Sequence, residues 1–225
     1  QKVLEECPAP NFPERVREKM YKTSVEFAKE IGYRNVGTVE FLYDPETENY
    51  YFLEVNTCLQ AEHGVTEEVL GIDLVEMMVK EAANELVNLY TYAKKPKGHS
   101  FQARIYVEDS FHLFQSSAGK LDRIVLSDLS RNETWVRDEL SVTTMYDPMI
   151  AKLIVHGNSR EEALDKLSKV LMETKFYGIK TNLQYLRKLL AEGQSEENDF
   201  SGGVRITYEG AGVRTANEGL WSEVC

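Results

Sequence analysis

The sequence predicts an α+β protein with a mostly antiparallel sheet and flanking helices. Three observations lead to this fold class. Apolar residues recur at helical spacing after Pro13, two alternating β-rich segments follow at 36–44 and 50–56, and residues 101–157 hold five further strand-like segments. Strands that follow one another without long crossovers favour antiparallel pairing.

The first helix is expected between Pro13 and Gly32. Proline suits the first turn of a helix and glycine suits its end. The apolar face of this helix consists of Val16, Met20, Phe27 and Ile31.

The segments VGTVEFLYD and YYFLEVN predict a β-hairpin, because a turn containing proline and asparagine separates them. Pairing Asp44 with Tyr50 leaves a loop of five residues, which is within the usual range. In that register Glu40 lies opposite Glu54.

The later elements follow from local signals. Capping-box patterns are formed by the pairs Asp73 and Glu76, Ser159 and Glu162, and Thr181 and Gln184. They predict helices near residues 73–89, 159–174 and 181–191. Strands are expected in FQARIYV, KLDRIVL, ETWVRD, SVTTMY and MIAKLIVHG. The lysine-rich segment KKPKGH is the best linker candidate.

Composition excludes several classes of protein. A net charge of −11 over 225 residues argues against a nucleic-acid binder or a basic membrane-surface protein. No apolar run reaches the roughly 18 residues of a membrane span, and QKVLEEC has no signal-peptide pattern. The three scattered cysteines suit reduced thiols, so we expect the cytoplasm or an organelle matrix.

The predicted hairpin carries a candidate metal site. Strand alternation puts Glu40, Leu42, Glu54 and Asn56 on one face, with Thr38 opposite Asn56. Two opposed carboxylates repel unless a cation lies between them, and magnesium binds carboxylates, amide oxygens and phosphates. The alternative is a solvated face whose charges point into water.

Polar residues follow the second strand of the hairpin. Gln60, Glu62 and His63 lie just past its end, a common place for catalytic groups. Glu62 could accept a proton from a metal-bound anion. The alternatives are a surface charge for Glu62 and a packed or capping histidine for His63.

Two basic residues are further candidates. Arg104 alternates with the apolar residues of its strand, so it either clamps an anion or pairs with Glu108 or Asp109. Lys2 precedes an apolar pair and by itself indicates nothing.

The segments EFLY, EVNTCLQAEHGVTE, ARIYVED, YDPMIAKLIVHG and YGIKTNLQYL, in this order and spacing, resemble biotin carboxylase. Gly64, IVHG and TNLQYL are similar to the urea carboxylase and urea amidolyase branch. The resemblance implies that residues 1–93 form the C-terminal part of an ATP-grasp domain. It further implies a linker at 94–98, a biotin carboxylase C-terminal domain at 99–208 and a tail at 209–225.

The resemblance implies a ligase that converts ATP and bicarbonate to carboxyphosphate and moves the carboxyl group to biotin. The implied cofactors are ATP, magnesium or manganese, and biotin on a carrier domain. The implied partners are the biotin carboxyl carrier domain, the N-terminal half of the ATP-grasp domain and a carboxyltransferase domain. No nucleic acid or membrane partner is expected.

The resemblance also implies roles for single residues. Glu40 and Glu54, with Asn56 beside them, would hold the metal. Bicarbonate would be bound by Lys2, Gln60, the backbone of Ala61, and Glu62. Glu62 would be the base, Arg104 would stabilise the biotin enolate, and Lys2 would complete the catalytic set. Leu42 and Ile206 would contact adenine.

Three departures from the family pattern qualify these expectations. Cys58 replaces an arginine that clamps bicarbonate, and losing a charged hydrogen bond costs about 1.5–3 kcal/mol, or roughly tenfold to a hundredfold. The glycine-rich half of the ATP-grasp fold would precede Gln1, so little activity is expected of this segment alone. The FQSSAG segment lacks the prolines of the family's turn.

Three functions therefore remain open. The chain is part of a biotin-dependent carboxylase, a non-catalytic remnant that serves as an interaction module, or a part of another ATP-grasp ligase that does not use biotin.

Overall fold

The computed structural model describes residues 2–85, 95–195, 210–213 and 222–223. The described residues divide into two compact units. One unit contains residues 2–6 and 98–195, and the other contains 7–85, 95–97 and the two short C-terminal strands. Each unit is described by itself. Among the described residues, no helix has the length and apolar character needed to cross a membrane.

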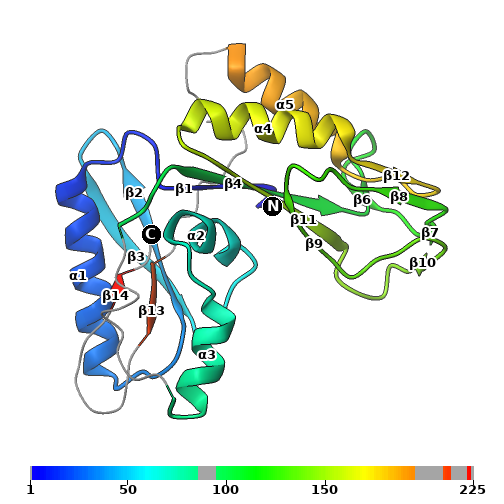
Figure 1. The fold of residues 1–225 in the computed structure, drawn as a ribbon. Helices are drawn as coiled ribbons and strands as arrows, with labels where there is room; N and C mark the ends of the chain where they lie inside the picture. Colours follow the sequence, from blue (N-terminus) through cyan, green and yellow to red (C-terminus); the bar gives the residue numbers. More distant parts are fainter. Residues whose placement is uncertain (1, 86–94, 196–209, 214–221, 224–225) are drawn as a thin grey trace. The chain divides into compact units, whose positions relative to one another are not determined.

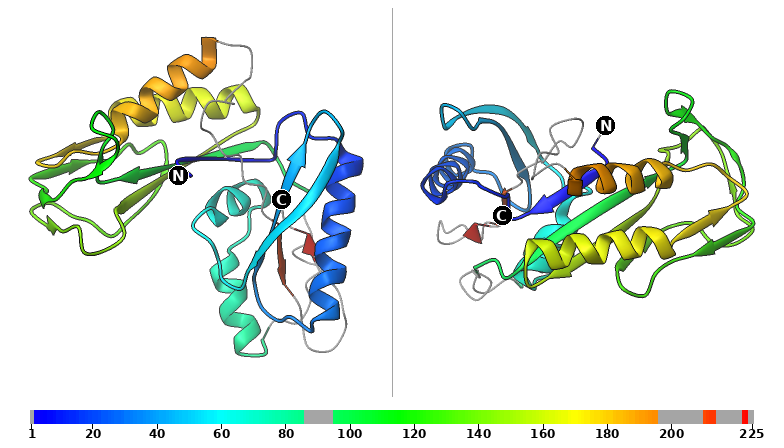
Figure 2. Two further views of the ribbon diagram at one scale, coloured as in Figure 1. Left: turned by 180° about the vertical axis from the view of Figure 1, so that it is seen from behind. Right: turned by 90° about the horizontal axis from the view of Figure 1, so that it is seen from above.

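The first unit is built on a four-stranded sheet in the order β1-β4-β11-β9 (Figure 1). These strands are β1 (Leu4–Cys7), β4 (His99–Tyr106), β11 (Met149–Gly157) and β9 (Arg131–Thr134). The helices α4 (Arg160–Glu173) and α5 (Leu183–Ser195) pack against this sheet, as two further views show (Figure 2). Buried side chains from both layers form one apolar core.

Shorter strands complete this unit, and some of their side chains pack against the core. They are β5 (Glu108–Asp109), β6 (Gln115–Ser116), β7 (Gly119–Lys120), β8 (Arg123–Val125), β10 (Ser141–Val142) and β12 (Lys175–Tyr177). They pair antiparallel as β5 with β6, β10 with β7, and β12 with β8. The expected antiparallel sheet with helices is confirmed.

The second unit combines a second sheet with three helices. Its sheet has the order β14-β13-β2-β3, from β2 (Thr38–Asp44), β3 (Asn49–Asn56), β13 (Gly210–Val213) and β14 (Ser222–Glu223). The helices are α1 (Glu14–Glu30), α2 (His63–Leu70) and α3 (Leu74–Ala82). Helix α1 contacts the hairpin: the Phe27 ring packs against the Phe52 ring at a tilt, and the Thr23 and Tyr50 hydroxyls share a hydrogen bond.

The hairpin register is partly as predicted. Glu40 pairs with Glu54, but a β-bulge follows and Asp44 pairs with Asn49 instead of Tyr50. The prediction at the turn was therefore wrong by one residue. Leu53 is the extra residue that absorbs the difference between the two registers.

Two of the three predicted helix caps are present. The side chain of Asp73 accepts a hydrogen bond from the backbone of Glu76 at 2.7 Å, and Ser159 does the same for Glu162 at 3.1 Å. The third is wrong. Thr181 approaches the backbone nitrogen of Leu183, not of Gln184, and only at 3.5 Å. The helix predicted near 73–89 is shorter than expected, because α3 ends at Ala82 and Asn84 has a left-handed φ of 55°.

Strand β1 was not predicted, because its sequence contains two adjacent glutamates. Both are buried and both have long-range partners. Glu6 accepts hydrogen bonds from two nitrogens of Arg160, at 2.6 and 3.1 Å. Burial raises the pKa of Glu6, and the Arg160 guanidinium opposes that shift.

This pair predicts a pH-dependent loss of stability. Arg160→Met should lower the free energy of unfolding by about 3–5 kcal/mol at pH 7, because it leaves a buried carboxylate unpaired. The folded state holds the Glu6 proton more tightly than the unfolded state, so folding is favoured below the ordinary pKa of 4.5. The difference in the free energy of unfolding between Arg160→Met and the unaltered protein, measured by urea unfolding, should therefore be smaller at pH 5 than at pH 7. Adding Glu6→Met should restore stability, and an equal loss at both pH values would contradict the prediction.

Candidate functional site

Two carboxylates lie side by side near the end of the β2–β3 hairpin. Glu40 and Glu54 are direct partners across the strands, just before the bulge. The side chain of Glu40 is buried, whereas Glu54 is exposed. Because cross-strand partners lie within about 5.5 Å of each other, their negative charges act on one another strongly.

Amide side chains hold these two carboxylates together. The Asn56 side-chain nitrogen donates to Glu40 Oε1 at 2.9 Å and to Glu54 Oε1 at 3.1 Å. The Gln60 nitrogen donates to the same Glu40 oxygen at 3.0 Å. One amide group thus stands between two carboxylate oxygens and partly offsets their repulsion.

This arrangement fits a hard divalent cation. Two carboxylate oxygens converge on one positively polarised group, and rotation of the Asn56 amide would present its oxygen in place of its nitrogen. Two carboxylates and an amide oxygen are ligands that magnesium and manganese accept. The predicted set of Glu40, Glu54 and Asn56 is therefore brought together, and Gln60 joins it.

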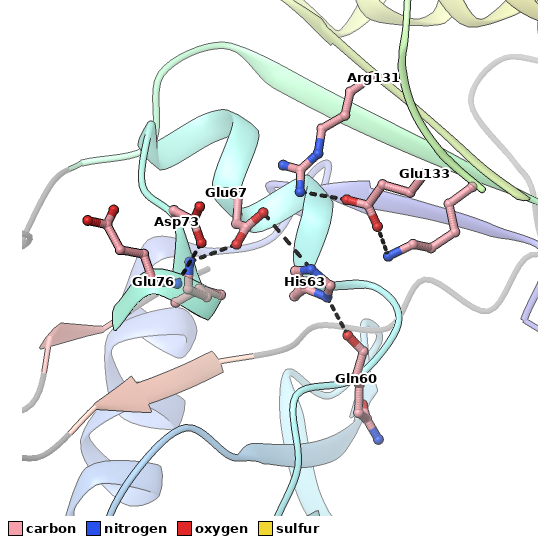
Figure 3. Close-up of polar contacts among 9 residues, drawn as sticks. Gln60, His63, Glu67, Asp73, Glu76, Arg131 and Glu133 are labelled. Carbon is pink, nitrogen blue, oxygen red and sulfur yellow. Dashed lines mark hydrogen bonds and ion pairs between the residues drawn. The ribbon is translucent and has the colours of Figure 1, made fainter. Parts of the chain in front are cut away.

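The segment after the hairpin leads into α2, a helix that was not predicted. Glu62 is buried directly before this helix, and Ala61 is half-buried. His63 Nδ1 lies 2.7 Å from the backbone oxygen of Gln60, which is the packing role considered for this histidine (Figure 3). Cys58, between the hairpin and α2, is exposed.

Glu67 is a buried residue that sequence reasoning missed. Its Oε1 accepts a hydrogen bond from the backbone of Leu74 at 2.7 Å, and its Oε2 lies 4.0 Å from His63 Nε2 (Figure 3). The four-residue spacing of His63 and Glu67 on a helix was the available signal. Glu67 ties the start of α3 to α2 and so supports the segment that carries Glu62.

Lys2 and Arg104 belong to the first unit. Arg104 Nε pairs with Glu5 Oε1 at 2.6 Å, a partner that the sequence did not suggest. Gln102 donates to the other oxygen of Glu5 at 3.0 Å. The sequence could not reveal this partner, because Glu5 and Arg104 are about a hundred residues apart and meet only where β1 joins β4.

Backbone contacts bring Lys2 close to Arg104. The Arg104 backbone nitrogen donates to Val3 at 3.0 Å, and the Tyr106 hydroxyl donates to the backbone oxygen of Lys2 at 3.3 Å. Burial raises the pKa of Tyr106, against the effect of the Arg104 cation. Both predicted residues therefore lie at the same end of the β1–β4 pair.

Leu42 and Ile206 are the two residues expected to contact adenine. Leu42 lies on β2, and 58% of its surface is exposed, so it is open to an apolar contact. Ile206 lies outside the described residues.

Two family models match the chain. Residues 102–204 match the biotin carboxylase C-terminal domain. Residues 1–90 match the ATP binding domain of the carbamoyl-phosphate synthase L chain. Together these matches include every candidate residue except Ile206.

Individual proteins give the same result. Urea amidolyase of Saccharomyces cerevisiae is 43% identical over 93% of this chain, which spans 11% of that protein. The Kluyveromyces lactis urea carboxylase structure has a TM-score of 0.84 and 43% identity over 87% of this chain, which spans 17% of it. The biotin carboxylase domain of Hydrogenobacter thermophilus 2-oxoglutarate carboxylase, in complex with MgADP, ADP and bicarbonate, has a TM-score of 0.81 and 33% identity. The chain covers 44% of that domain, and 90% of the chain is matched.

The shared amide predicts a coupling between the two carboxylates. Asn56→Ala should lower the free energy of unfolding by about 1–3 kcal/mol in metal-free buffer, because both carboxylates lose their common donor. The same change should cost less when Glu54 is already glutamine, since the repulsion is then absent. Equal costs in a double-mutant cycle would show that Asn56 does not couple the pair.

Proposed function

Because this chain belongs to the biotin carboxylase family, we propose that it forms one wall of a site that carboxylates biotin with ATP and bicarbonate. The proposed enzyme is a biotin-dependent carboxylase of the urea carboxylase type. The observation that carries this proposal is the convergence of Glu40 and Glu54 on one amide, next to a segment that buries Glu62.

Glu40, Glu54 and Asn56 are the proposed metal-binding residues. Magnesium or manganese bound there would neutralise charge on the phosphates of ATP. Gln60 donates to Glu40 and keeps that carboxylate oriented towards the pair. Leu42 would provide an exposed apolar contact for adenine, as would Ile206.

Glu62 is the proposed base. In the proposed reaction its carboxylate takes the proton of bicarbonate, and the bicarbonate oxygen attacks the γ-phosphorus of ATP to give carboxyphosphate and ADP. Gln60, the backbone N–H of Ala61 and Lys2 would bind the bicarbonate. Burial of Glu62 supports this role, because a base shielded from water is more strongly coupled to a bound acid.

Arg104 is proposed to stabilise the biotin enolate when the carboxyl group is transferred. Its Nε pairs with the buried Glu5, which fixes the guanidinium group in position. Lysine at position 104 could keep the ion pair with Glu5, but it lacks the planar set of donors of a guanidinium group. Arg104→Lys should therefore not stabilise the enolate as arginine does.

Cys58 is proposed to weaken bicarbonate binding. It is exposed and provides no donor comparable to the guanidinium group of arginine. We further propose that the chain divides into an ATP-grasp part at 1–93, a linker at 94–98, a carboxylase C-terminal domain at 99–208 and a tail at 209–225. The partners would be the other half of the ATP-grasp domain, a biotin carrier domain and a carboxyltransferase domain, in the cytoplasm.

Metal binding can be tested without turnover. Manganese at a hundred times its dissociation constant should raise the free energy of unfolding by about 2.7 kcal/mol, because only the folded state has the site. Glu54→Gln should abolish this gain in urea unfolding with and without the metal. Glu46→Gln, an exposed change in the hairpin turn, is the control and should keep the gain. A similar gain in Glu54→Gln would place the metal elsewhere.

The reaction is tested in the full-length protein from which this sequence comes. Glu62→Gln should lower bicarbonate-dependent ATP hydrolysis by about 10²–10⁴-fold while ATP binding stays near normal, because a general base contributes that much. Glu46→Gln should leave the rate unchanged. Retained turnover in Glu62→Gln would reject the base assignment, and absence of carboxylation by the unaltered protein would favour the non-catalytic remnant.

A further inference from the structure

The first unit contains a cavity of about 420 Å³ at the start of α5. It is lined by β12, by the loop that follows β5, and by the residues around the first turn of α5. This volume lies in the usual range for small-ligand sites. None of the residues that line the cavity belongs to the candidate site described above.

The first turn of α5 has a poor cap. Asn182 directly precedes the helix and would be a good capping residue, but its side chain is used elsewhere. Its oxygen accepts a hydrogen bond from the backbone of Tyr106 at 2.9 Å, and its nitrogen donates to Arg104 at 3.0 Å. Among the side chains that the structure describes, only Thr181 approaches the turn, at 3.5 Å from the backbone nitrogen of Leu183. The positive end of this 13-residue helix thus remains available at the cavity.

A buried hydroxyl group in the cavity wall points independently to a ligand. Thr174 lines the cavity and is fully buried, and its Oγ1 has no hydrogen-bond partner among the residues that the structure describes. Such a group is unfavourable in the free protein unless something polar binds to it.

The charged residues around the cavity favour an anion. Of the described residues, three cations line it, Lys175, Lys180 and Arg187, against one carboxylate, Asp109. Asp109 is paired with Lys180 at 2.5 Å and with His112 at 2.8 Å. This local excess of positive charge stands out in a chain of net charge −11.

These cations are not equally available. Arg187 donates to the backbone oxygens of Leu171 and Thr174, at 2.8 and 3.0 Å, and so is committed to the end of α4. Lys175 is exposed and has no ion-pair partner among the residues described. Lys175 is therefore the cation best suited to bind a ligand directly.

We propose that this cavity binds a phosphate group, with contacts from the first-turn N–H groups of α5, the Thr174 hydroxyl and the Lys175 ammonium group. The phosphate is either inorganic phosphate or the phosphate of a nucleotide. A helix N-terminus combined with a lysine point charge is a common way to bind phosphate.

Chemical shifts of the backbone amides in the first turn of α5 provide a local test, because binding at a distant site would not change them. Inorganic phosphate, ADP and adenosine are titrated separately into the 15N-labelled chain, and the amides of Gln184 and Tyr185 are followed by NMR. We expect saturable shifts with inorganic phosphate and with ADP and none with adenosine. Tighter binding of ADP would identify a nucleotide as the source, and equal affinities would identify free phosphate.

Variants separate binding from folding. Lys175→Gln should weaken binding about tenfold, the lower end expected for a charged hydrogen bond, while Lys169→Gln, an exposed change on α4 outside the cavity, should not. Thr174→Val should weaken binding roughly fivefold without lowering thermal stability, because its hydroxyl is unsatisfied in the free protein. Absent shifts, equal shifts with adenosine, or affinities unchanged in both cavity variants would overturn the proposal.

Discussion

The opposition of Glu40 and Glu54 is the constraint around which the candidate site is arranged. Two carboxylates on neighbouring strands cannot approach without a donor between them, and Asn56 supplies one nitrogen to both. Gln60 adds a second donor from beyond the end of the hairpin. The same two amides therefore connect the end of β3 with the segment that leads to Glu62, and the paired carboxylates make this face negative.

The elements that sequence reasoning located are those whose signal is local. The hairpin follows from alternation with period two, and its register near Glu40 is strongly specified because a shift by one residue would exchange the two faces. The predicted pairing at the turn was wrong because the bulge at Leu53 shifts the strand register by one residue. The alternation of apolar and polar residues does not reveal such a bulge. Helix α2 was missed because it has no side-chain cap and is buried on nearly every side, so no amphipathic pattern marks it.

The remaining misses depend on partners that are distant in sequence. Strand β1 contains Glu5 and Glu6, which locally indicate an exposed segment. Both are buried only because Arg104 and Arg160 neutralise them from β4 and from the start of α4. The ion pair of Arg104 is compatible with a second role for this residue, the binding of an anion. A guanidinium group has several donors in a fixed plane, so pairing through Nε orients the group without defining what its remaining donors bind.

Asn182 illustrates how one side chain serves competing demands. It can satisfy the first turn of α5 or the end of β4, but its short amide cannot reach both, and it is directed to β4. That contact joins the helix to the sheet and buries Asn182 completely. Thr181 is one residue too early to replace it as a cap, which is why the capping pattern there failed while those at Asp73 and Ser159 held. The tertiary contact thus takes precedence over the local one, and the unsatisfied groups it leaves behind are concentrated at the wall of a cavity rather than in the core.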